Sequence, residues 1–142
     1  MQNPRADGME FPPSNSNGGN VRAITVDALP SPKGHYAYCI EHNGLLFISG
    51  QLPVDDRGVI PDGIEAQTAL VLRKLDEILL AAGSARDRVL RLRVYISDIS
   101  LWDTVNAHCA AYFATHRPAR CIVPVGPLHH GCLIEIEADT AL

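Results

Sequence analysis

The chain has 142 residues, of which 46% are hydrophobic and 20% charged, and its formal net charge is -4. These values are typical of one soluble globular domain and exclude a disordered or fibrous protein. The acidic balance argues against a dedicated nucleic-acid partner, because phosphate neutralisation requires a basic surface. Four scattered cysteines without C-x-x-C spacing predict reduced core thiols and no metal site.

The first twenty residues are rich in Asn, Gly, Pro and Ser and contain no apolar stretch. Such a segment buries too little apolar surface to offset the entropy of ordering it. We therefore expect a mobile tail over residues 1–20 and one domain over residues 21–142. Because neither a secretory signal nor a membrane-spanning run is apparent, we expect a cytoplasmic protein without a membrane partner.

The first half of the domain predicts strands followed by a long helix. A β-branched run over residues 21–27 predicts a first strand. The next two β-rich runs flank Asn43-Gly44, a dipeptide that accepts positive φ at both centres of a type I′ turn, so they predict a β-hairpin. Apolar residues then recur at helical spacing over residues 62–83.

The ends of this helix have sequence signals of their own. Asp62 and Glu65 resemble a capping box at its start. Gly83 is expected to end it, because glycine accepts the left-handed conformation that closes many helices.

The second half alternates strands with one more helix. Residues 88–97 alternate as a strand, and residues 99–113 return to helical spacing with Ser100 and Asp103 as the expected cap. Two further strands are predicted, within CIVPV at 121–125 and CLIEIEA at 132–138. The order β-β-β-α-β-α-β-β requires parallel crossovers. It predicts an α+β domain with a six-stranded mixed sheet and both helices on one face.

Charged residues interrupt the last two predicted strands. Period-two alternation places Glu135 and Glu137 on one face of the final strand, and Arg120 lies with Ile122 on one side of the strand before it. We expect both strands to present this charge on the face that the helices leave bare. Phe47 would lie beside it, so a second subunit could cover the face and form a cleft for a small anionic ligand. The alternative is an ordinary ion pair between Arg120 and Glu135 or Glu137.

A set of short motifs follows these elements in order. They are SGQLP (49–53), AQT (66–68), LxxILxxAGS (75–84), VYISD (94–98), VN (105–106), YF (112–113), PAR (118–120) and IEIEA (134–138). Over residues 21–140 this set resembles the Rid (YjgF-type) family, the reactive intermediate deaminases.

The resemblance implies both an assembly and an activity. The assembly is a homotrimer of chorismate-mutase-like subunits, whose sheets pack into a central barrel and whose pockets lie between neighbours. The activity is hydrolysis of 2-imino and 2-enamino carboxylates, such as 2-aminoacrylate or 2-iminobutanoate, to 2-keto acids and ammonia, without a cofactor or metal.

The resemblance also implies roles for residues of the motifs. Arg120 matches the carboxylate-binding arginine of the family, whose fork of donors suits a carboxylate. The backbone N–H of Gly50, after Ser49, matches the second contact to that carboxylate. Glu135 matches the residue that orients the attacking water and relays protons. Arg120 and Glu135 are thus the implied catalytic residues.

Tyr36 and Asn106 match the pocket tyrosine and asparagine of the family. Their plain alternatives are a strand aromatic with a solvated tip and an amide that braces a helix. The family's cysteine two places after the arginine is absent, and Cys121, adjacent instead, is expected to face away from the pocket side and to pack. His129 and His130 follow Leu128 where the family has Leu-Pro, and we interpret them as exposed loop residues rather than metal ligands.

Three alternative functions remain open from the sequence. One is a non-catalytic trimer that binds a carboxylate metabolite through the same pocket. Another is a deaminase of a larger, aminomuconate-type enamine. A third, RNA cleavage, has been attached to some members of the family, and the acidic balance argues against it here.

Overall fold

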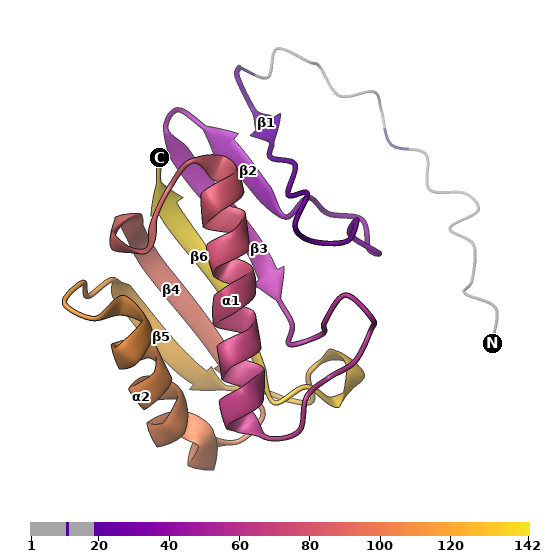
Figure 1. Ribbon diagram of the computed structural model, residues 1–142, viewed down its shortest axis with the longest axis vertical. Helices are drawn as coiled ribbons and strands as arrows, with labels where there is room; N and C mark the ends of the chain where they lie inside the picture. The colour runs from indigo at the N-terminus through magenta and orange to yellow at the C-terminus, as the bar shows by residue number, and fades with distance from the viewer. Residues whose placement is uncertain (1–10, 12–18) are drawn as a thin grey trace.

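One mixed sheet carries both helices on the same face (Figure 1). The computed structural model describes residue 11 and residues 19–142, so the tail expected over 1–20 lies almost wholly outside the described residues. The sheet order is β1-β2-β3-β6-β4-β5, in which β4 and β5 are parallel and the other neighbours antiparallel. The predicted α+β architecture is confirmed. The strands are β1 (Arg22–Ala23), β2 (Cys39–His42), β3 (Leu45–Gln51), β4 (Val89–Ile96), β5 (Ala119–Pro124) and β6 (Ile134–Ala141), and the helices are α1 (Ile64–Ala82) and α2 (Trp102–Phe113).

The hairpin between β2 and β3 turns at the predicted dipeptide. Asn43 has φ 52° and Gly44 φ 77°, the two positive values that a type I′ turn requires. The first strand is shorter than predicted, because β1 ends at Ala23. The chain then leaves the sheet edge, and Val26 is buried in the core while its carbonyl oxygen accepts a turn bond from Leu29.

Helix α1 ends as predicted and begins differently. Gly83 adopts φ 76° and its N–H donates to the carbonyl oxygens of the last turn, which confirms the glycine stop. At the other end, Gly63 is the N-cap residue with φ 83°, and no side chain caps the helix. The capping box predicted from Asp62 and Glu65 is therefore wrong. The chain enters the helix through a backbone conformation that favours glycine.

Helix α2 is preceded by a short 3-10 turn, η2 (Ile99–Leu101). The carboxylate of Asp98 accepts a hydrogen bond from the backbone N–H of Ser100 at 2.8 Å and caps this turn. The prediction that Ser100 and Asp103 supply the cap is wrong, because the turn begins earlier and uses the acid before it.

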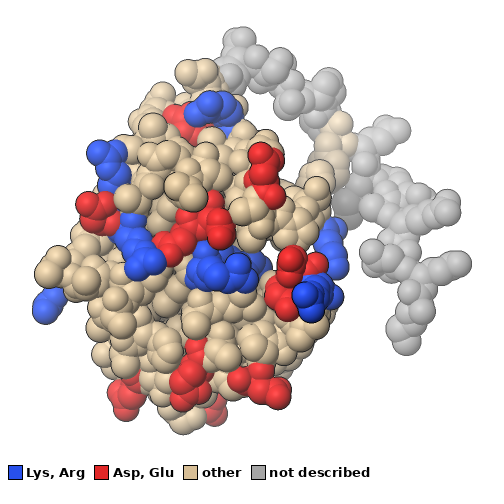
Figure 2. Space-filling view, viewed as in Figure 1, with Lys and Arg blue, Asp and Glu red and all other residues tan. Residues whose placement is uncertain are grey.

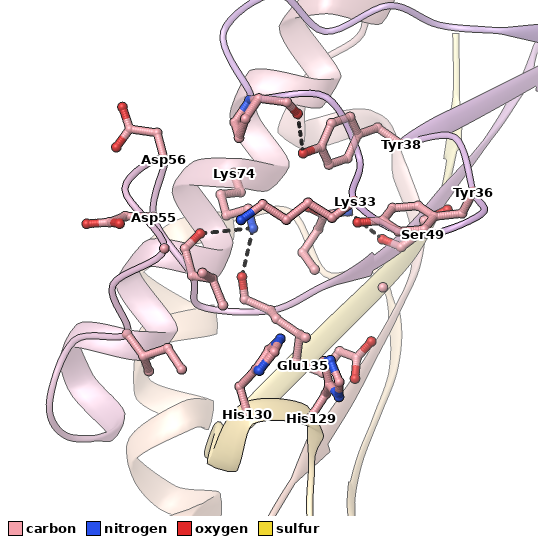
Figure 3. Close-up of a pocket in the computed structure, with 18 of the residues that line it drawn as sticks. Lys33, Tyr36, Tyr38, Ser49, Asp55, Asp56, Lys74, His129, His130 and Glu135 are labelled. Carbon is pink, nitrogen blue, oxygen red and sulfur yellow. Dashed lines mark hydrogen bonds between the residues drawn. The ribbon is translucent and has the colours of Figure 1, made fainter. Parts of the chain in front are cut away.

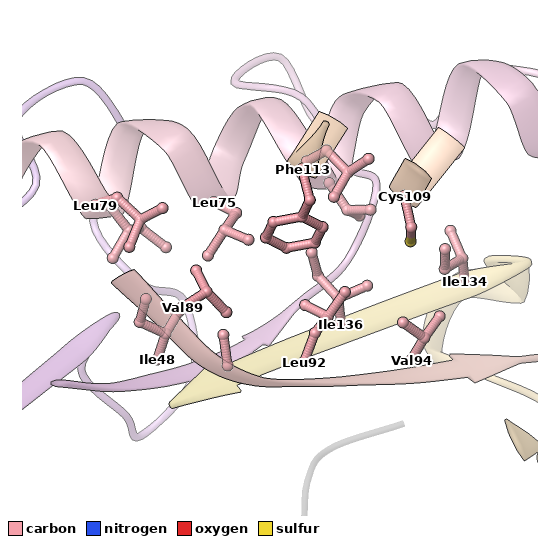
Figure 4. Packing of buried hydrophobic residues seen from close by; sticks show 14 of the residues in the cluster. Ile48, Leu75, Leu79, Val89, Leu92, Val94, Cys109, Phe113, Ile134 and Ile136 are labelled. Carbon is pink, nitrogen blue, oxygen red and sulfur yellow. The ribbon is translucent and has the colours of Figure 1, made fainter. Parts of the chain in front are cut away.

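The core lies between the two helices and the sheet (Figure 4). Leu75 and Leu79 of α1 and Phe113 of α2 meet the buried faces of β3, β4 and β6. Burying each such side chain contributes about 1.5–3 kcal/mol relative to exposure. Among the described helices, none is long and apolar enough to span a membrane. The cytoplasmic location remains a prediction.

The cysteines fit the core prediction with one exception. All four are free, and Cys39, Cys109 and Cys132 are buried. Cys121 is exposed on β5, so its expected role in packing within the subunit is wrong.

An ionic clamp joins the two helices away from the sheet. Asp76 of α1 accepts two hydrogen bonds from Arg86, at 2.9 and 2.5 Å, and a third from the Tyr112 hydroxyl at 2.6 Å. The guanidinium also lies 4.1 Å from the centroid of the Tyr112 ring. Burial and this carboxylate together raise the pKa of Tyr112, so the phenol stays protonated and donates.

Candidate functional site

A bulge in β3 brings Gly50 against Glu135. Ile48 pairs with Ala138 but Gln51 with Ile136, so β3 carries one residue more than β6 between these pairs. A Cβ at Gly50 would clash with Oε1 of Glu135 and lie 3.2 Å from its Cδ. Glycine is required here because the carboxyl group occupies the space of a side chain.

Ser49 supports the bulge with its own hydrogen bonds. Its hydroxyl donates to the carbonyl oxygen of Ala37 at 2.6 Å, and its backbone N–H donates to the carbonyl oxygen of Tyr38 at 3.0 Å. The residue predicted to bind substrate therefore also ties the bulge to the chain before β2.

Glu135 lies on the sheet face that the helices leave bare. Its neighbours Ile134 and Ile136 are buried under the helices, whereas Glu135 is half-buried on the opposite face. Burial raises the pKa of Glu135, the charge of Glu137 raises it further, and the charge of His129 lowers it. A carboxylate of raised pKa can accept a proton from water and return it near neutral pH.

Gly50 and Glu135 form part of the wall of a cavity of about 740 Å³ (Figure 3). Tyr36 lies in the wall with its ring edge-on to Tyr38, at 6.1 Å between centroids and 87° between planes. The Tyr38 hydroxyl donates to the carbonyl oxygen of Pro30 at 2.7 Å, and burial raises its pKa. Tyr36 is 49% exposed, which leaves its hydroxyl end accessible to a ligand.

Lys74, which was not predicted from the sequence, holds the loop that forms another wall of this cavity. Nζ of Lys74 donates to the carbonyl oxygens of Leu52 and Val54 at 2.8 and 3.3 Å, so α1 holds the loop that follows β3. Burial lowers the pKa of Lys74. Nothing in the helical pattern marks this residue, because its contact depends on the path of a loop twenty positions away.

Arg120 and Asn106 meet elsewhere, at the edge of the sheet beside α2. Nη2 of Arg120 donates to Oδ1 of Asn106 at 2.9 Å, and the guanidinium carbon lies 5.8 Å from the centroid of the Trp102 ring. Arg120 pairs in register with Leu92, whose side chain is buried under the helices. Arg120 therefore points to the helix side, and the prediction that it shares a face with Glu135 is wrong.

The alternative ion pair between Arg120 and the acids of β6 is also wrong. Within residues 19–142, the partners of Glu137 are Tyr95, whose hydroxyl donates to Oε1 at 2.5 Å, and Arg93, whose Nη1 lies 3.9 Å from the same atom. Arg93 bonds Asp139 as well, at 3.1 Å. The hydrogen bond and burial raise the pKa of Tyr95 to about 12.

The orientation of β5 reverses a second expectation. Cys121 and Val123 pair with Arg93 and Tyr95, so they lie on the bare face together with the acids of β6. The prediction that Cys121 faces away from the pocket side is therefore wrong. Phe47 and Leu45, 46% and 41% exposed, add apolar area to this face.

The predicted site residues thus fall into two groups within one chain. The pocket group, Tyr36, Ser49, Gly50 and Glu135, lines the cavity. The arginine group, Asn106 and Arg120, lies at the β5 edge of the sheet and outside the lining of that cavity.

The comparisons with known proteins decide the family. The family model described as "Endoribonuclease L-PSP" matches residues 26–142. The chain is 31% identical over 119 residues to "2-iminobutanoate/2-iminopropanoate deaminase" of Mus musculus. This match covers 82% of this chain and 88% of the mouse protein. The chain belongs to the Rid family.

Solved Rid structures have the same fold. The Rid protein YyfA from Yersinia pestis superposes with a TM-score of 0.83 at 36% identity and covers 86% of this chain and 99% of that one. TdcF of E. coli, solved with bound serine, gives a TM-score of 0.80 at 29% identity and covers 85% and 98%.

Over the described part of the chain, no cluster of three or more His, Cys, Asp or Glu side chains could hold a metal ion. Acidic and basic side chains are interspersed on the helix-covered side (Figure 2).

Proposed function

We propose that this Rid protein hydrolyses 2-imino and 2-enamino carboxylates to 2-keto acids and ammonia. The observation that carries the proposal is the carboxyl group of Glu135 packed against Gly50 in the wall of an open cavity. The activity named for the mouse relative and the serine bound by TdcF support the same substrate class, a small carboxylate derived from an amino acid.

The proposal includes a trimer of chorismate-mutase-like subunits, with their sheets packed into a central barrel. A base and a carboxylate anchor must act on one substrate, yet Glu135 and Arg120 lie on opposite faces of one sheet. A neighbouring protomer that covers the bare face would bring its arginine group to the pocket group of the first. The apolar residues Phe47 and Val123 on that face favour such a cover.

The first step of the proposed mechanism is substrate capture. The guanidinium of Arg120, oriented by Asn106, donates two hydrogen bonds to the substrate carboxylate. The backbone N–H of Gly50 provides the second contact to it, and Tyr36 lies along the substrate. These contacts hold C2 of the substrate over the carboxylate of Glu135.

Hydrolysis then follows at C2. Glu135 accepts a proton from a water molecule as the oxygen bonds to C2, and the electrons of the C=N bond move to nitrogen. Proton transfer to nitrogen gives a carbinolamine. Loss of its hydroxyl proton forms the C=O bond, and a further proton on nitrogen allows ammonia to leave.

A larger substrate within the same class is the second candidate. A cavity of about 740 Å³ in one subunit is wide for a four-carbon imine. An enamine of the aminomuconate type would use the same anchor and base while filling more of the volume.

The test is to generate imines in situ with an amino-acid oxidase or dehydratase and to follow their decay for a panel of side chains. We expect the wild type to accelerate decay and Arg120→Ala to lose most of the acceleration. Arg117→Ala, which removes an exposed arginine three positions away, serves as the matched control. No acceleration for any imine, or equal rates for Arg120→Ala and wild type, would refute the proposal.

The same preparation distinguishes the alternatives. A non-catalytic binding protein would bind 2-ketobutyrate through Arg120, and Glu135→Gln would change none of its functions. RNA cleavage would require ribonuclease activity that survives purification and disappears in Arg120→Ala.

A further inference from the structure

Two adjacent histidines stand at the cavity in the turn η3 (His129–Gly131), directly before β6. His130 adopts φ 59° and Gly131 φ 71°, and the N–H of Gly131 donates to the carbonyl oxygen of Leu128 at 3.1 Å. A left-handed conformation costs a residue other than glycine about 1–2 kcal/mol. Backbone strain of this kind gathers at functional sites.

Gln67 of α1 holds the chain directly after the turn. After it, the N–H of Leu133 donates to Oε1 of Gln67 at 2.8 Å, and Nε2 of Gln67 donates to the carbonyl oxygen of Pro61 at 3.0 Å. Gln67 is buried, with 4% exposure. The chain that carries the two imidazole rings, whose centroids lie 3.7 Å apart, is therefore anchored to α1.

His129 and Glu135 belong to the same wall of the cavity (Figure 3). A positive charge on His129 would lower the pKa of Glu135, whereas burial and the charge of Glu137 raise it. Charges that lie near each other shift each other's pKa in this way, and His129 is itself exposed to solvent, as expected for this loop.

Two other ionisable groups of the cavity are already engaged in hydrogen bonds to the backbone. Lys74 already donates to two carbonyl oxygens, and the Tyr38 hydroxyl to a third. Imidazole is the side chain that ordinarily changes charge between about pH 5 and 8. The remaining charged or ionisable groups in the cavity wall are Lys33, Tyr36, Asp55, Asp56, His130 and Glu137.

On the basis of the imine hydrolysis proposed above, we infer that His129 is a second proton-transfer group that works with Glu135. Glu135 accepts a proton from water as the C2–O bond forms, and the imidazolium of His129 gives a proton to the imine nitrogen. In the collapse, protonated Glu135 gives its proton to nitrogen, His129 takes the hydroxyl proton, and the C–N bond breaks. Ammonia leaves, and both side chains return to their starting states.

The test compares His129→Gln with wild type in the imine-decay assay across pH 5.5 to 8.5, as full-length protein. His108→Gln is the matched control, because its ring bonds the Thr104 carbonyl within α2, outside the cavity lining. We expect kcat/KM of His129→Gln to fall about 100-fold. We also expect its pH profile to lose the alkaline limb that deprotonation of the imidazolium produces. Added imidazole should restore part of the rate of His129→Ala.

The outcomes separate this inference from the proposed function. An active wild type together with a His129→Gln variant of equal rate and unchanged pH profile would overturn the role of His129 and leave the deaminase proposal intact. A wild type inactive on every imine would overturn both. A rate loss in His129→Gln with an unchanged profile and no imidazole rescue would indicate a structural role and would likewise overturn the inference.

Discussion

Gly50→Ala tests the contact that positions the proposed base. The added Cβ would clash with Oε1 of Glu135 and lie 3.2 Å from its Cδ, so the carboxyl group must move by about 1 Å. A displacement of this size in a catalytic group costs about 10²-fold in rate. We expect kcat/KM in the imine-decay assay to fall by about that factor.

The same substitution should hardly affect folding. The clash is with the free end of a flexible side chain, and Gly50 is not among the residues with positive φ, so alanine fits its backbone. Alanine also stabilises by about 0.4–1 kcal/mol through the unfolded state. We therefore expect the Tm to stay within about 4 °C of wild type.

Gly126→Ala provides the control for Gly50→Ala. A Cβ at Gly126 meets no atom within 4 Å, so rate and Tm should both remain near wild type. A Gly50→Ala variant as active as wild type would refute the reasoning that Gly50 positions Glu135. A Tm lowered by much more than about 4 °C would show that the backbone, rather than the carboxyl group, absorbs the clash.

Three further predictions address stability and assembly. Tyr112→Phe removes the hydrogen bond to the carboxylate of Asp76 and should lower the free energy of unfolding, measured in urea, by about 1.5–3 kcal/mol. An unchanged urea midpoint would contradict a stabilising role for this hydrogen bond. Because the raised pKa of Glu135 makes its charged form unfavourable in the folded state, wild type loses stability as pH rises through that pKa. Glu135→Gln should therefore have a higher Tm than wild type at pH 7 and the same Tm as wild type at about pH 3. A Tm difference of equal size at the two pH values would contradict this pH dependence. Phe47→Asp places a charge on the bare face and should convert the proposed trimer to monomers by light scattering, and an unchanged mass would contradict the proposed interface.

The features that the sequence predicted well are those set by local chemistry. Asn43-Gly44 specifies its turn because few other dipeptides accept two positive φ values, and Gly83 ends α1 for a related reason. The close approach of Gly50 to Glu135 was not predicted from the sequence, because the bulge that produces it arises from long-range pairing.

The face of β5 could not be predicted from alternation. Period-two spacing shows which residues share a face but not which face meets the helices. Both faces of this edge strand are largely exposed in the subunit, so burial supplies no contrast. The parallel register with β4, set by contacts far apart in the sequence, decides that Arg120 lies on the helix side and Cys121 on the bare face.

Mixed trimers test most directly the claim that one site is shared between two protomers. Arg120→Ala and Glu135→Gln, each inactive alone, would be co-expressed with different affinity tags, and assemblies that carry both tags would be purified. Every trimer that contains both variants places an intact Arg120 beside an intact Glu135 of its neighbour at one of its three interfaces, so about one third of the sites are complete. We expect imine decay to return to roughly that fraction of the wild-type rate. Mixed assemblies as inactive as the separate variants would contradict it.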